Sequence, residues 1–178
     1  RFDNIDISCL LYAPEEGTDV KAIVQIAHGM CEHKERFIPF MEFLCGNGYI
    51  CVISDHRGHG ESVLDPDDLG YFYSGGASAL VDDLVNVNET VRKRYPDKPL
   101  YLFGHSMGSL AVRSFTKKYS RLIDGLIVCG SPSRNPAAGA GKMLTRLISS
   151  FKGDKHRPKL IQNIAFESFN KKFESEGR

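Results

Sequence analysis

The sequence predicts an α/β protein built on a mostly parallel, doubly wound sheet with helices on both faces. Short, nearly continuous apolar runs suit strands that are covered on both sides; they lie at residues 22–27, 49–54, 99–103 and 126–129. Stretches with helical spacing separate these runs, at residues 37–45, 79–95 and 109–119. Regular alternation of strand and helix is the pattern of a parallel sheet.

Composition narrows the class of protein. The chain has 178 residues with 42% hydrophobic and 25% charged residues, which are ordinary globular values. A net charge of +1 gives no reason to expect a nucleic-acid partner, and no run of 18 apolar residues forms a transmembrane segment. No secretory signal is visible. The five cysteines form an odd number without a C-x-x-C motif, which favours reduced thiols in a cytoplasmic protein over disulfides or a zinc site.

The first part of the chain leads into a candidate oxyanion turn. Residues 4–13 alternate partially and predict a strand of an antiparallel entry hairpin, followed by a turn at 14–17 and the first central strand at 21–27. That strand ends at His28-Gly29-Met30. A glycine after a central strand lets backbone amides face a ligand, so we expect the Met30 amide to be one oxyanion donor.

Two histidines near this turn have several interpretations. We interpret His28 and His33 as side chains that hydrogen-bond neighbouring loops, rather than as a catalytic base. A metal site made of His28, Glu32 and His33 is the weaker alternative, because no helix would place the three on one face. We therefore predict no metal site.

A polar loop follows the next strand. The helix at 37–45 ends at Gly46-Asn47-Gly48, and the strand at 49–54 leads into residues 55–62, DHRGHGES. The carboxyl end of a strand is where ligands bind in open α/β sheets. The glycines of this loop could suggest a phosphate-binding loop, but the loop lacks the remaining glycine and the lysine of such motifs. We expect Asp55 and Arg57 to brace it through a charge-assisted pair.

Residues 104–108, GHSMG, are the centre of the predicted site. They follow the strand at 99–103 and precede a helix that starts at Met107, which is the context of a nucleophile elbow. Ser106 would stand on a strained turn, and Gly104 and Gly108 would avoid collisions with the turn and the adjacent strand. The Met107 amide, at the helix N-terminus, is the second expected oxyanion donor.

The character of the chain changes after Ser131. Residues 135–141 are rich in Ala, Gly and Pro, and helical patterns at 142–151 and 159–173 flank a basic linker. We predict the N-terminal part of an α/β core at residues 1–131 and the beginning of a helical cap at 132–178. An ordinary pair of packing helices is the alternative. The basic linker is typical of a solvated face more than of a membrane patch, which leaves transient membrane-surface contact through the cap as the second interpretation.

These motifs resemble those of the α/β-hydrolase superfamily, in particular its bacterial lysophospholipase and monoacylglycerol lipase-like branch, which overlaps with proteins called serine aminopeptidases. The resemblance rests on residues 28–37, 55–62 and 104–108, whose order and spacing match. It implies that Ser106 is the nucleophile, that the Met30 and Met107 amides form the oxyanion hole, with Gly29 in the oxyanion turn, and that a cap covers an acyl pocket. It implies no cofactor.

One departure from the family concerns the remainder of the triad, which the family supplies in the order Ser, Asp, His. The aspartates after Ser106 are Asp124 and Asp154, and the later histidine is His156. Asp124 precedes a strand at the wrong end of the sheet, and Asp154 and His156 lie two residues apart in the cap linker. We assign neither role to them and expect the triad acid and histidine beyond Arg178, in a longer protein. The strand at 126–129 would then expose an apolar edge.

The resulting hypothesis is a serine hydrolase that cleaves carboxylic esters of single-acyl-chain lipids, monoacylglycerol or lysophospholipid, through an acyl-enzyme on Ser106. A peptidase or thioesterase on the same fold is the nearest alternative. A non-catalytic ligand-binding homologue, or an interaction fragment that uses its exposed edge, is the alternative outside enzymes. The sequence gives no indication of oligomeric state.

Overall fold

A computed structural model of the chain describes residues 4–133, 138–159 and 163. The chain divides into two compact units, of which the first ends at Pro132 and the second begins at Ser133. The first unit contains the sheet and the predicted site, and the second contains helix α4 (Ala138–Lys152).

The first unit is organised around a five-stranded sheet with the order β1-β3-β2-β4-β5. Its strands are β1 (Cys9–Tyr12), β2 (Ala22–Ala27), β3 (Tyr49–Ser54), β4 (Leu100–His105) and β5 (Gly125–Cys129). All neighbouring pairs are parallel except β1 with β3. The mostly parallel sheet predicted from the apolar runs is therefore confirmed.

The predicted entry hairpin is wrong. Strand β1 pairs with β3, two strands along the chain, and not with its sequence neighbour β2. The reason is that β2 is central: β3 takes one of its edges and β4 the other, both in parallel register. Every residue of β2 is buried, and β1, none of whose residues is buried, takes the outer edge of β3.

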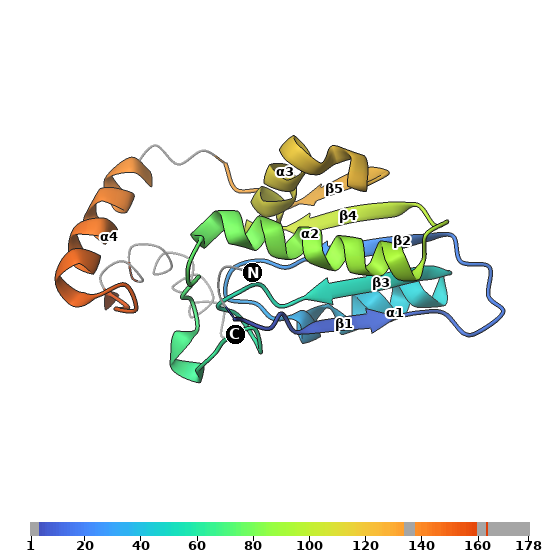
Figure 1. Ribbon diagram of the computed structural model, residues 1–178, viewed down its shortest axis with the longest axis horizontal. Coiled ribbons are helices and arrows are strands. Elements are labelled where there is room, and N and C mark those ends of the chain that lie inside the picture. Colours follow the sequence, from blue (N-terminus) through green and yellow to red (C-terminus); the bar gives the residue numbers. More distant parts are fainter. Residues whose placement is uncertain (1–3, 134–137, 160–162, 164–178) are drawn as a thin grey trace, which may run out of the picture. The chain divides into compact units, whose positions relative to one another are not determined.

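Helices cover both faces of the sheet, as predicted for a doubly wound fold (Figure 1). Helix α1 (Ile38–Gly46) packs on one face, where Val24, Ile26 and Met41 belong to one buried cluster. Helices α2 (Gly76–Arg94) and α3 (Met107–Tyr119) pack on the other face and against each other. Short 3-10 helices are η1 (Lys34–Phe37), η2 (Pro66–Asp68) and η3 (Ser120–Leu122).

Helix α2 follows the apolar stripe read from the sequence. Leu80, Leu84, Val87 and Val91 are all buried, as helical spacing on one face requires. The helix begins at Gly76, earlier than predicted, because Gly75 adopts φ 83° and turns the chain into the first helical turn.

Strand β5 is the outermost strand of the sheet within the described residues. Leu126, Ile127 and Val128 remain 37%, 46% and 42% exposed. The apolar edge expected at residues 126–129 is therefore present in the described part of the chain.

In the second unit, α4 confirms the helix predicted at 142–151 and begins earlier, at Ala138. Met143 and Phe151 are exposed on it, at 75% and 83%. Of the second predicted cap helix, residues 160–162 and 164–173 lie outside the described residues, as do residues 135–137 of the stretch rich in Ala, Gly and Pro. Among the helices described, none combines the length and apolar character needed to cross a bilayer.

Candidate active site

Ser106 occupies the sharp turn between β4 and α3. Its φ of 51° and ψ of −116° lie outside the regions that side-chain-bearing residues ordinarily adopt. Hydrogen bonds on both sides hold the turn: the Ser106 amide donates to the Cys129 carbonyl at 2.9 Å, and the Ser109 amide donates to the Ser106 carbonyl at 3.0 Å. The strained residue is thus fixed between β5 and the first turn of α3.

The two glycines of the turn are required by space. A Cβ on Gly108 would lie 2.1 Å from the Ala27 carbonyl oxygen and 2.5 Å from that of His28, at the end of β2. A Cβ on Gly104 would lie 2.5 Å from Val112 Cγ2. This is the steric reason expected from the G-x-S-x-G pattern, and it brings the backbone after β4 directly against the backbone after β2.

The turn after β2 lies beside the serine. A Cβ on Gly29 would lie 3.2 Å from Ser106 Cβ, because β2 and β4 are parallel neighbours with Ala27 opposite Gly104. Within the described part of the chain, neither the Met30 amide nor the Met107 amide donates a hydrogen bond. Met107 is the first residue of α3, where helical amides lack an internal acceptor.

Buried polar side chains grip this turn. His28 is fully buried; its Nδ1 lies 2.7 Å from the Gly29 carbonyl oxygen, and its Nε2 accepts a hydrogen bond from the His56 amide at 3.0 Å. Glu32 accepts a hydrogen bond from the Gly29 amide at 2.6 Å and forms an ion pair with Arg36. Both ring nitrogens of His28 are therefore engaged by backbone, which suits the bracing role favoured from the sequence.

Glu32 also faces the elbow. Its Oε1 lies 3.9 Å from Nε2 of His105, the residue before the candidate nucleophile. Phe37, Phe40 and Phe103 line a hollow of about 410 Å³ beside these side chains. Sequence reasoning treated Glu32 only as a weak metal-ligand candidate. Its position three residues after Gly29, within reach of that amide, was the available signal.

His33 differs from His28. It lies on the surface, and its Nδ1 is 2.8 Å from a Glu35 carboxylate oxygen. The weak metal-site alternative placed His28, Glu32 and His33 together, but the carboxylates that converge in the described residues are those of Glu35, Asp55 and Glu61.

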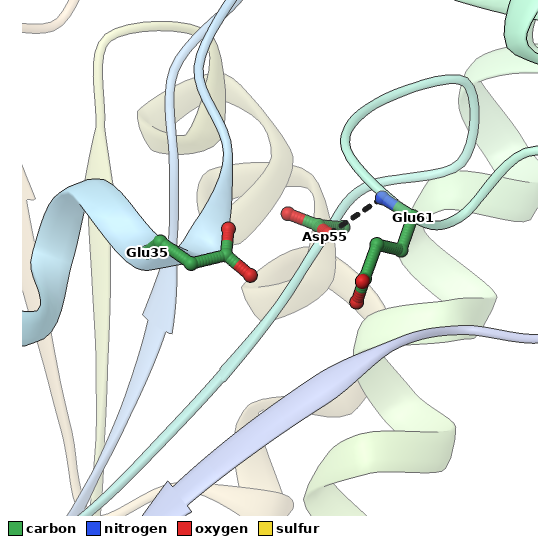
Figure 2. Close-up of side chains that lie close together, drawn as sticks. All are labelled: Glu35, Asp55 and Glu61. Carbon is green, nitrogen blue, oxygen red and sulfur yellow. Dashed lines mark hydrogen bonds between the residues drawn. The ribbon is translucent and has the colours of Figure 1, made fainter.

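This carboxylate cluster surrounds a buried lysine (Figure 2 shows the three acids and the bond from the Glu61 amide to Asp55). Lys34 is 2% exposed, and its Nζ lies 2.7 Å from Glu35, 2.8 Å from Asp55 and 2.6 Å from Glu61. Burial alone would lower the pKa of Lys34, but hydrogen bonds to the three carboxylates raise it above its ordinary value. The same contact lowers the pKa of Glu35 to about 2. An ammonium group therefore supplies the positive charge that the acids require.

The pair predicted between Asp55 and Arg57 is wrong. Asp55 accepts hydrogen bonds from the Lys34 amide and ammonium, at 2.7 and 2.8 Å. Arg57 instead binds the Asp83 carboxylate of α2 through two nitrogens, at 2.7 and 3.0 Å. The two charges find partners in different elements, Asp55 in η1 and Arg57 in α2. The loop after β3 is braced, but to η1 and to α2.

Burial disfavours the charged form of three histidines near the site. Burial lowers the pKa of His28 and of His59, and it lowers that of His56 to about 3. Their rings form one group, with centroids of His28 and His56 4.1 Å apart and those of His28 and His59 5.4 Å apart. None of the described histidines forms a hydrogen bond with the Ser106 hydroxyl.

Asp124 lies at the opposite end of β4 from the serine. Asp124 accepts a hydrogen bond from the Leu100 amide at the amino end of β4 and lies 3.6 Å from Arg92. Asp154 bonds to Ser149 within the second unit. The placement of the triad acid and histidine beyond Arg178 stays a prediction.

Comparison with known proteins gives a consistent set of relatives. Residues 18–171 match the family model described as serine aminopeptidase, S33. Monoglyceride lipase of Mus musculus is 34% identical over 88 residues, which cover 49% of this chain and 27% of that protein. Monoacylglycerol lipase of Mycolicibacterium smegmatis is 28% identical over 127 residues, covering 71% of this chain and 43% of that protein.

Solved structures agree with the fold. A thermostable carboxyl esterase from Bacillus coagulans superposes with a TM-score of 0.74 at 28% identity, covering 82% of this chain and 46% of the esterase. A soluble variant of monoglyceride lipase from Saccharomyces cerevisiae superposes with a TM-score of 0.68 at 24% identity, covering 85% of this chain and 51% of the lipase. The chain thus spans about half, or less, of the length of each of these proteins.

Proposed function

This chain belongs to the serine aminopeptidase S33 family of α/β-hydrolases, and from that membership we propose that it supplies the nucleophile and oxyanion hole of a serine ester hydrolase. The observation that carries the proposal is that the serine and two backbone amides lie together at the carboxyl ends of β2 and β4. Ser106 stands on a strained turn. The Met30 amide lies in the turn after β2, and the Met107 amide lies directly after Ser106. Within the described residues, neither amide donates a hydrogen bond. Such an arrangement suits stabilisation of a tetrahedral oxyanion.

The proposed reaction proceeds through an acyl-enzyme. The Ser106 hydroxyl loses its proton to a base and attacks the carbonyl carbon of the ester, while the two amides stabilise the negative oxygen. Collapse of the intermediate breaks the ester bond, and the alcohol leaves with a proton. Water then releases the fatty acid and regenerates Ser106. We propose that the base and its orienting acid come from sequence beyond Arg178.

The substrate class rests on the relatives. Several of them are named monoglyceride or monoacylglycerol lipases, which supports an ester with a single acyl chain, a monoacylglycerol or a lysophospholipid. The family description names an aminopeptidase, so amide hydrolysis is the second candidate. The cytoplasmic location, the division into a core and a cap, and transient membrane-surface contact through that cap stay predictions.

The test measures covalent labelling and hydrolysis in the full-length protein. A fluorophosphonate probe should label Ser106, and Ser106→Ala should abolish both labelling and hydrolysis of a monoacylglycerol. Ser114→Ala, an exposed serine on α3, should change neither. Labelling at another residue, or hydrolysis that survives Ser106→Ala, contradicts the proposal. Cleavage of an aminoacyl amide but not of a monoacylglycerol would select the peptidase.

A further inference from the structure

The turn after β2 contains a peptide bond whose orientation is controlled by one side chain. The Gly29 carbonyl and the Met30 amide belong to the same peptide unit, and the described chain has no cis peptide bonds. In a planar trans peptide, the C=O and N–H groups point in opposite directions. The contact of 2.7 Å between His28 Nδ1 and the Gly29 carbonyl oxygen therefore determines where the Met30 N–H points.

The hydrogen bonds also determine which nitrogen of His28 carries the proton. Nε2 lies 3.0 Å from the His56 amide nitrogen. A backbone amide can only donate, so Nε2 is the acceptor and carries no hydrogen. In the neutral ring the proton is then on Nδ1, which donates to the Gly29 carbonyl. The His56 ring nitrogen Nε2, 2.9 Å from the His28 carbonyl oxygen, closes the loop of contacts.

The surroundings of His28 favour this neutral form. The charged and titratable groups that face it are Asp55, whose carboxylate oxygen is 4.0 Å from Nε2, the rings of His56 and His59, and the Glu32 carboxylate. Burial lowers the pKa of His28 and outweighs the acids. Protonation would set a second N–H of the ring against the His56 amide and break the contact.

A second side chain holds the preceding peptide. The Gly29 N–H donates to Glu32 at 2.6 Å, and Glu32 is itself 9% exposed. A Cβ on residue 29 would lie 2.7 Å from the same carboxylate oxygen, so glycine is what permits this approach. Both peptides that flank Gly29 are thus held by side chains, at the point where the turn lies beside Ser106.

We propose that His28, through its Nδ1–H, is a positioning residue that aims the Met30 amide at the oxyanion, with Glu32 holding the peptide before it. This inference rests on the proposed function, because it assumes that Met30 is an oxyanion donor. It assigns His28 a role in the reaction rate without proton transfer to or from the substrate.

Two amide substitutions separate the ring nitrogens. In His28→Asn the side-chain NH2 occupies about the place of Nδ1 and can still donate to the Gly29 carbonyl. In His28→Gln the side-chain oxygen occupies about the place of Nε2 and accepts from the His56 amide, and nothing replaces the Nδ1–H. In the full-length protein acting on p-nitrophenyl butyrate, His28→Gln should lower kcat by about 10²-fold, with KM changed by less than about 3-fold, because a misaimed oxyanion donor affects mainly the transition state. His28→Asn should retain kcat within about 10-fold of the wild type.

His33→Gln is the matched control, because it makes the same change at an exposed histidine of the same turn; its kcat should equal that of the wild type. Wild-type kcat in His28→Gln would overturn the proposal, and so would equal losses in the Asn and Gln variants. If either variant fails to fold, the Glu32 pair decides: Glu32→Gln keeps an acceptor for the Gly29 amide and should retain more kcat than Glu32→Met. Equal kcat in these two would also overturn it.

Ser106→Ala distinguishes a failure of the proposed function from a failure of the positioning role of His28. If that variant remains active, the proposed function fails and the role of Met30 fails with it. If Ser106→Ala is inactive while His28→Gln is fully active, the hydrolase function stands and only the positioning role is lost.

Discussion

The turn after β2 and the turn after β4 lie side by side at the carboxyl ends of these parallel strands, yet different interactions hold them. The turn at Ser106 is shaped by missing atoms, since Gly104 and Gly108 leave room for neighbouring backbone and side chains. The turn at Gly29 is shaped by added groups, namely the His28 ring and the Glu32 carboxylate, and the Lys34 ammonium binds the adjoining η1 to the loop after β3.

The two turns are therefore expected to fail in different ways. A turn held by close packing is damaged when a methyl group is inserted, because the backbone it would strike cannot yield. A turn held by buried polar side chains is damaged when a partner is removed, because the group left behind is desolvated without compensation. The three predictions below test this contrast.

The largest effect is expected from Lys34→Met. The change leaves the fully buried Asp55 carboxylate without its ammonium partner, although two backbone amides still donate to it. Breaking a buried ion pair by removing one partner costs about 3–5 kcal/mol, so the free energy of unfolding in urea should fall by that amount.

Lys117→Met on the exposed surface of α3 is the control for Lys34→Met, and it should stay within about 0.5 kcal/mol of the wild type. A loss below about 1 kcal/mol for Lys34→Met, as for a solvent-exposed ion pair, would mean that the cluster does not hold η1 to the loop after β3.

Gly108→Ala should cost about 3 kcal/mol, the upper part of the range for overpacking, because the new methyl group meets two carbonyl oxygens of the main chain. Urea unfolding measures this loss, and labelling of Ser106 by the fluorophosphonate probe should slow in parallel.

Gly46→Ala is the comparison for Gly108→Ala, since a Cβ at the last residue of α1 meets nothing within 4 Å. It should be neutral or stabilise by up to about 1 kcal/mol. If the two alanine variants have equal stability, close packing does not shape the turn at Ser106.

Acid should weaken the polar turn. The pKa of His56 is lowered by burial to about 3, and burial also lowers the pKa values of His28 and His59. Below the ordinary histidine pKa of about 6.5, the unfolded chain binds more protons than the folded chain, so the free energy of unfolding falls as the pH falls. His56 alone should remove about 2 kcal/mol between pH 6.5 and pH 5.

Urea unfolding at pH 7.5, 6.5, 5.5 and 5.0 measures this dependence. His33→Gln, which removes an exposed histidine, should leave its slope unchanged. Stability that stays constant from pH 7.5 to pH 5.0 would mean that the buried histidines are not held neutral by the fold.

The features that depend on local pattern could be predicted from the sequence. Apolar runs located β2, β3, β4 and β5, helical spacing located α1, α2 and α3, and the G-x-S-x-G pattern predicted a strained turn between β4 and α3. These features were predictable because periodicity and glycine act over a few consecutive residues, whatever the rest of the chain does. Because β2 and β4 are parallel, the residues that follow them lie at the same end of the sheet.

The pairing of groups distant in the sequence depends on how the chain packs and could not be predicted from local pattern. Strand β1 pairs with β3 and not with β2. Asp55 pairs with Lys34 and not with Arg57, and Arg57 pairs with Asp83 of α2. Lys34 lies 21 residues from Asp55, whereas Arg57 is almost adjacent in the sequence, so proximity along the chain favours the wrong partner. Which groups pair depends on which side chains the packed sheet and helices bury together. An unpaired buried charge is costly, so each buried carboxylate or cation pairs with the opposite charge that the fold places within reach.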